Sequence, residues 1–163
     1  MTEIELGKLI AIIKDSCYYH YLILSEPMFF GCRWAYAFHR TSHQLLTESE
    51  VLTSFGEGFH ALIDFESEID EEKISIIGKG IDTTPYQIKR NSKVRIDKPD
   101  GGHMWYIFDS SLQIIRKQNS LKSTQFDLPV ANRITCGDAL LLIDKKWKTE
   151  QVVKEEGQGQ FPI

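Results

Sequence analysis

A chain of 163 residues has the length of one ordinary domain, and 42% hydrophobic with 26% charged residues is a globular composition. These values argue against a disordered chain, a fibrous repeat and a supercharged tail protein. The formal net charge of −4 also argues against a protein that mainly binds nucleic acid, because phosphate binding is driven by basic surfaces. We therefore expect a single globular domain over residues 1–156 and a flexible tail over residues 157–163.

The N-terminal segment, residues 2–16, has the pattern of an amphipathic helix. Thr2 and Glu5 have the spacing of a capping box, which satisfies free amide groups at a helix start. Apolar residues such as Leu9 and Ile13 then recur with a period near 3.6. The segment predicts a helix.

Residues 18–40 are rich in aromatic and branched side chains and are interrupted at Pro27 and Gly31, which favours two strands over one helix. The second strand alternates strictly, so that three aromatic residues share one face: Trp34, Tyr36 and Phe38. We interpret this row as a core stripe rather than as an aromatic platform for a ligand. Residues 45–58 then have the pattern of a short helix or turn.

Residues 60–70 fit two structures. As a strand, the segment places Ala61, Ile63, Phe65 and Ile69 on one face and acidic residues on the other. As a helix, it places Leu62, Phe65 and Ile69 on one stripe. We favour the strand.

Short apolar or alternating runs over residues 73–118, separated by turn residues, predict an antiparallel meander. Within it, "DKPDGG" supplies a proline and the pair Gly101 and Gly102 between two strands, which indicates a hairpin turn rather than a phosphate-binding loop. Residues 139–143 predict a further strand, followed by a helix. The whole pattern predicts an α+β fold in which the N-terminal helix packs on a mainly antiparallel sheet, a meander of short strands.

The sequence favours the cytoplasm. Glu3 and Glu5 precede the first apolar run where a secretory signal would carry positive charge, and no stretch approaches the ~20 apolar residues of a membrane-spanning helix. Three cysteines with no close spacing, Cys17, Cys32 and Cys136, fit reduced thiols better than a disulfide framework.

No reaction signature stands out among the five histidines. His39 and His43 have the i,i+4 spacing of a metal pair on a helix, but on a strand they would lie about 13 Å apart, too far to bind one ion. We therefore expect neither a metal site nor a cofactor. Histidine pairs can also cleave RNA by acid–base transfer, and this keeps open a small metal-independent enzyme acting on RNA or a small ligand.

Negative charge gathers in residues 57–72, which contain seven acidic residues and no lysine or arginine. On a strand, alternate carboxylates would repeat every ~6.8 Å and form a ladder of negative charge. Such a face attracts a basic partner and speeds its capture, although it could also be a merely solvated surface. The expected partner-binding residues are Asp64, Glu66, Glu68, Asp70, Glu71 and Glu72.

These features favour a small acidic cytosolic protein that binds and neutralises a basic protein, with no nucleic-acid or membrane partner. The profile of small size, negative charge and no catalytic signature is similar to that of bacterial immunity proteins, which neutralise toxin domains. This resemblance implies a toxic nuclease domain as one possible kind of basic partner. The basic residues within 89–98 leave nucleic-acid binding as a weaker alternative.

Overall fold

The computed structural model describes residues 4–28, 31–54, 56–65, 70–88, 90–126, 128, 132–135 and 143. They fall into two compact units, one built around Met1–Tyr86 and the other around Gln87–Arg133. The single domain expected over residues 1–156 stays a prediction, because the compactness of a unit does not say whether it folds alone.

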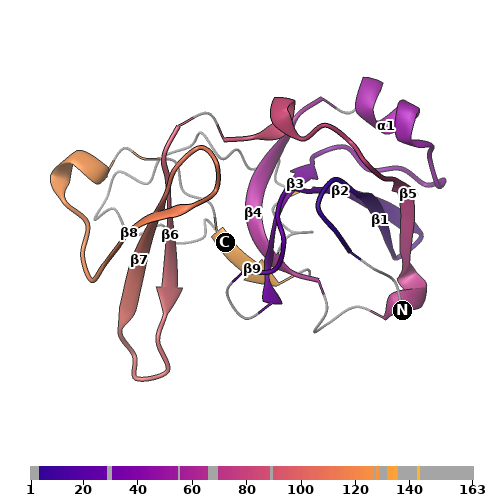
Figure 1. Ribbon diagram of the computed structural model, residues 1–163. Helices are drawn as coiled ribbons and strands as arrows, with labels where there is room; N and C mark the ends of the chain where they lie inside the picture. The colour runs from indigo at the N-terminus through magenta and orange to yellow at the C-terminus, as the bar shows by residue number, and fades with distance from the viewer. Residues whose placement is uncertain are drawn as a thin grey trace. The chain divides into compact units, whose positions relative to one another are not determined.

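The first unit is built on a six-stranded sheet with the strand order β5-β1-β2-β3-β4-β9 (Figure 1). Strands β1 to β4 pair with their chain neighbours in antiparallel fashion, and β5 returns to pair antiparallel with β1. The strands are β1 (Leu9–Lys14), β2 (Cys17–Ile23), β3 (Arg33–Phe38), β4 (Gly58–Asp64), β5 (Ile74–Gly78) and β9 (Asn132–Thr135).

The N-terminal helix expected from the sequence is wrong, because Leu9–Lys14 forms strand β1. This strand lies between β2 and β5, and its residues Leu9 to Ile12 are at most 3% exposed. A strand buried on both faces is continuously apolar instead of alternating, so its spacing can also match a helical period. The fold of the described residues is therefore mostly β, and its α-helix, α1 (Glu48–Ser54), lies in the middle of the chain.

Strands β1 and β2 are joined by a two-residue hairpin. Asp15 and Ser16 both have positive φ, 52° and 62°, while Lys14 and Cys17 face each other across the turn. Turns with two central residues of positive φ match the twist of antiparallel strands. This turn fixes the register that buries both faces of β1.

The two strands expected within residues 18–40 and the short helix after them are confirmed as β2, β3 and α1. Trp34 and Phe38 on β3 are fully buried, as a core stripe requires. The helix begins at a capping box: the Thr47 hydroxyl accepts a hydrogen bond from the Glu50 amide (3.3 Å), and a Glu50 carboxylate oxygen accepts one from the Thr47 amide (3.2 Å). Val51 is its buried contact with the core.

The preference for a strand near residue 60 is confirmed for Gly58–Asp64, which forms β4 and pairs antiparallel with β3. Both of its faces are covered, because His60 and Leu62 are buried as well as Ala61 and Ile63. The alternation expected here, with one apolar and one acidic face, is therefore absent from β4 itself.

The second unit contains a three-stranded antiparallel meander, β6 (Ser92–Asp97), β7 (His103–Phe108) and β8 (Ile114–Gln118). The predicted meander over residues 73–118 holds for these three strands, whereas β5 joins the other sheet. Short 3₁₀ helices accompany the strands: η2 (Glu71–Lys73), η3 (Thr84–Tyr86) and η4 (Ser123–Gln125). The strand and helix expected after residue 138 and the tail 157–163 lie outside the described residues, apart from Ile143.

The hairpin expected at "DKPDGG" is confirmed as the turn between β6 and β7. The Lys98 amide donates to the Gly102 carbonyl (2.7 Å), and the Gly101 amide donates to the Lys98 carbonyl (3.1 Å). Gly101 has φ 92°, a conformation that costs a residue with a Cβ, and an Asp100 carboxylate oxygen accepts the Gly102 amide proton (3.0 Å). The two glycines therefore serve the turn, and Gly101 is the one whose φ requires glycine.

Candidate protein-binding surface

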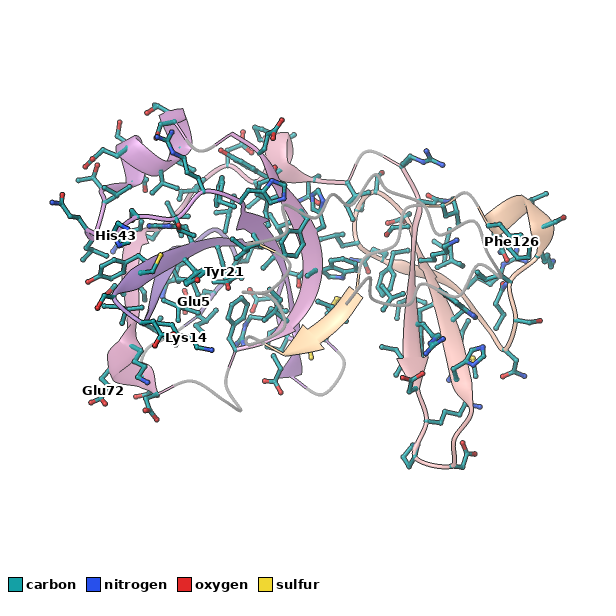
Figure 2. All side chains as sticks on the ribbon, turned by 180° about the vertical axis from the view of Figure 1, so that it is seen from behind. Glu5, Lys14, Tyr21, His43, Glu72 and Phe126 are labelled. Carbon is teal, nitrogen blue, oxygen red and sulfur yellow. The ribbon has the colours of Figure 1, made fainter. Side chains whose placement is uncertain are left out.

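Three consecutive carboxylates stand on the surface between β4 and β5. Asp70 precedes the 3₁₀ helix η2, whose first two residues are Glu71 and Glu72, and all three side chains are exposed. The Asp70 carbonyl accepts the Lys73 amide proton (2.9 Å), which closes the turn. Figure 2 shows Glu72 directed away from the sheet. We call these three residues the acidic turn.

The acidic turn has little internal neutralisation. The nearest positive charge along the chain is Lys73, which directly follows the acidic turn. None of the three carboxylates makes an ion pair with another residue of the described chain. Exposed carboxylates without a partner keep their charge in water and project a field that falls off over about 8 Å at physiological salt. The turn is thus a compact negative patch that a basic surface can approach.

The other expected partner-binding residues, Asp64, Glu66 and Glu68, do not belong to the acidic turn. Asp64 ends strand β4, where its side chain is half-buried and interacts within the protein. Glu66 and Glu68 lie outside the described residues. The evenly spaced ladder from Asp64 to Asp70 therefore stays a prediction, while the structure places Asp70, Glu71 and Glu72 together in one exposed turn.

Charge is divided unequally along the chain. Residues 1–86 contain fourteen acidic and six basic residues, a net charge of −8, whereas residues 87–133 contain four acidic and nine basic residues, a net charge of +5. These ranges correspond to the main segments of the two compact units. The weak overall charge of −4 therefore conceals one strongly acidic and one basic unit.

Rings from β3, β4 and η3 form an aromatic cluster that includes His60. The ring centroid of Tyr36 lies 5.1 Å from those of Phe38 and His60 and 5.2 Å from that of Tyr86. The Tyr36 hydroxyl donates to the Gly56 carbonyl (3.2 Å), and burial is the main cause that raises the pKa of Tyr36 to about 12. Most of these ring pairs pack edge to face, and Tyr36 and Tyr86 are tilted at 59°, as in a core.

His60 is buried within this cluster, and its Nε2 bonds to the Tyr86 carbonyl. A carbonyl can only accept, so Nε2 carries the proton of the neutral imidazole. Burial lowers the pKa of His60 to about 4, against the opposing effect of this hydrogen bond. The imidazole is therefore neutral at pH 7 and is occupied in holding η3 to the sheet.

The remaining histidines are dispersed over different environments. His20 is fully buried on β2, and desolvation lowers its pKa to about 4. His43 is exposed and its Nδ1 contacts the Ser16 carbonyl (3.3 Å), His39 stacks near Phe59 (6.0 Å between centroids), and His103 stands beside Trp105 in the second unit.

Within the described ranges, no three His, Cys, Asp or Glu side chains gather as metal ligands. Cys17 is half-buried and Cys32 is buried, and neither forms a disulfide with another described residue. Cys136 lies outside the described residues. That His39 and His43 bind no metal stays a prediction.

The burial of Lys93 was not predicted from the sequence. Lys93 on β6 is fully buried, and its Nζ donates to the carbonyl of Gln125 (3.1 Å) and to that of Phe126 (2.5 Å) at the end of η4. The Trp105 ring centroid lies 5.9 Å from the same Nζ. The alternating pattern of β6 gives no signal of this burial, because it places Lys93 on the same face as the charged Arg95.

The chain matches no family model, no curated protein and no solved structure. None of the helices in the described residues is long and apolar enough to cross a membrane.

Proposed function

We propose that this protein is a small cytoplasmic binding protein that neutralises a basic protein partner, with the acidic turn as part of the contact surface. The observation that carries the proposal is the set of three exposed carboxylates in η2 and the residue before it, on a unit whose main segment has a net charge of −8. A basic surface would gain both electrostatic steering and charge-assisted hydrogen bonds there.

A toxic nuclease domain is the partner class that this surface fits best. Nucleases bind phosphate through lysine and arginine clusters, and a row of carboxylates can occupy the same cationic site. Binding of this kind would block the nuclease without any catalytic group on the inhibitor. The role would be that of an immunity protein, acting in the cell that produces the toxin.

The alternative of a histidine enzyme has less support. His20 and His60 are buried and neutral at pH 7, and the ring nitrogen of His60 is bonded to backbone. A general acid or base must instead reach a substrate and titrate near the working pH. The three other histidines lie in separate settings, and His103 belongs to the other unit.

The test is capture of a partner with matched charge variants. The full chain and its Glu71→Lys/Glu72→Lys variant are immobilised and exposed to lysate of the native host, with a Glu26→Lys/Glu57→Lys variant as the control of equal net charge. Glu26 and Glu57 are also exposed but lie outside the acidic turn. We expect the wild type and the control to retain one basic protein that the acidic-turn variant loses.

The captured protein is then expressed in a naive host with and without this chain. Growth arrest that the wild-type chain relieves, and the acidic-turn variant does not, is the expected result. Equal capture by all three baits, or a captured protein that inhibits no growth and has no activity blocked by this chain, would contradict the proposal.

A further inference from the structure

The terminal strand of the three-stranded sheet, β8 (Ile114–Gln118), exposes most of its side chains to solvent. It pairs with β7 on one side and is the terminal strand in the order β6-β7-β8, so its outer edge has no strand partner among the described residues. Four of its five residues are exposed, including two adjacent isoleucines, Ile114 at 44% and Ile115 at 52%. Unpaired amide and carbonyl groups on such an edge are a template for another strand.

The charges on β8 point to both faces of the sheet. Arg116 stands opposite Ile107 and Lys117 opposite Tyr106, and neighbouring residues of a strand face opposite sides. The Nζ of Lys117 lies 5.9 Å from the Tyr106 ring centroid. A strand added to this edge would therefore meet one positive charge on each face. The register shifts between Ile107 and Phe108, which pair with Arg116 and Ile114, so Ile115 lies in a β-bulge and the two isoleucines do not continue the regular alternation.

Positively charged residues on an edge strand, such as Arg116 and Lys117, commonly protect a sheet against unwanted pairing. Protection accounts for Arg116, Lys117 and the bulge at Ile115, but it does not account for the exposure of the two isoleucines, Ile114 and Ile115. The same positive charges that repel a neutral or basic strand attract an acidic one. Residues 87–133 add to this selection, because their net charge is +5.

We propose that β8 binds an extended acidic segment of a partner protein, which adds to the three-stranded sheet as a fourth strand. Backbone hydrogen bonds to the free edge give affinity, and side chains give selectivity. The fitting segment has two adjacent acidic residues opposite Arg116 and Lys117 and two adjacent β-branched residues that pack beside the bulged pair Ile114 and Ile115. This site is independent of the acidic turn, which lies in the other unit and selects the opposite charge.

The test uses the isotope-labelled full chain and a capped peptide of sequence Thr-Glu-Glu-Val-Val-Thr, together with its reversed sequence to allow for either strand direction. We expect saturable NMR shifts centred on residues 114–118 and slower amide exchange there. A peptide with lysine in place of glutamate should not bind. An acidic peptide with proline in place of both valines should also fail, since proline cannot donate to a ladder.

Charge reversal in Arg116→Glu/Lys117→Glu should weaken the acidic peptide roughly tenfold or more, since each of two contacts changes from attraction to repulsion, and should create binding of the lysine peptide. The control Lys79→Glu/Lys98→Glu changes the net charge equally at exposed sites off the strand and should bind as the wild type does. The proposal is overturned if no peptide perturbs residues 114–118, if the proline peptide binds equally well, or if single-stranded RNA binds this edge in preference to the acidic peptide.

Discussion

Replacement of Lys93 by methionine tests whether the buried ammonium group stabilises the second unit. The variant keeps the length of the side chain but loses both hydrogen bonds from Nζ to the carbonyls of Gln125 and Phe126 and the contact with Trp105. Hydrogen bonds of charged groups contribute about 1.5–3 kcal/mol each. Removal of the buried ammonium offsets this by returning a desolvation cost of several kcal/mol. Because the carbonyls of two half-buried residues lose their donor, we expect a net loss of about 1–3 kcal/mol.

The assay for this prediction must separate the two units, since a single unfolding midpoint can mix them. Native-state hydrogen exchange does so, because it reports opening free energies for individual amides. In Lys93→Met, amides of β6 and β7 should exchange faster while those of β2 and β3 keep their wild-type rates. Lys98→Met, at an exposed position of the neighbouring turn, is the control. A methionine variant as stable as the wild type would refute the view that this ammonium stabilises η4.

Two further predictions concern the turn and the buried histidines. Gly101→Ala should lower the free energy of unfolding by about 1 kcal/mol, because alanine is strained at a φ of 92°. No clash adds to this cost, since nothing lies within 4 Å of an added Cβ. Gly102→Ala should lower the free energy of unfolding by less, and denaturant titration of both variants checks this. His20 and His60 have a pKa of about 4 against the ordinary 6.5, so the unfolded state binds more protons between these values. The free energy of unfolding should therefore be highest above about pH 6.5 and fall as the pH approaches 4, by roughly 3 kcal/mol per histidine at most. A series of unfolding curves at different pH values measures this fall. If the His20→Leu variant lost as much stability with falling pH as the wild type, the prediction would be contradicted.

Local signals in the sequence predicted the elements that depend on local chemistry. Strands β2 and β3 follow from aromatic and branched residues that are interrupted at Pro27 and Gly31, and α1 lies within residues 45–58, whose pattern predicted a short helix or turn. The β6–β7 hairpin follows from its turn residues, because few conformations suit proline and glycine at those positions.

Non-local pairing could not be predicted in the same way. Strand β1 is a strand because β2 and β5 flank it, and a run buried on both sides has no alternating pattern to reveal it. Likewise β5 pairs with β1 across some sixty residues of chain, while spacing alone assigned it to the following meander. Secondary-structure propensity is a weak prior where tertiary contacts decide.

The candidate surface was predicted in part. The exposure of Asp70, Glu71 and Glu72 is what their composition suggests, since unpaired acidic residues are rarely buried. Asp64 is half-buried because β4 carries it to the rim of a sheet whose two faces are both covered. The burial of Lys93 depends on a backbone segment thirty residues later in the chain, which no local pattern encodes.

The central claim, that the acidic turn captures a basic partner, is tested most directly by association rates measured against ionic strength. Stopped-flow mixing of the captured partner with wild-type chain, Glu71→Lys/Glu72→Lys and the control Glu26→Lys/Glu57→Lys gives three curves. We expect the acidic-turn variant to associate about tenfold or more slowly at low salt and to approach the wild-type rate as salt screens the charges, with the control close to wild type throughout. Equal rates for the acidic-turn variant and the wild type at every ionic strength would contradict the claim.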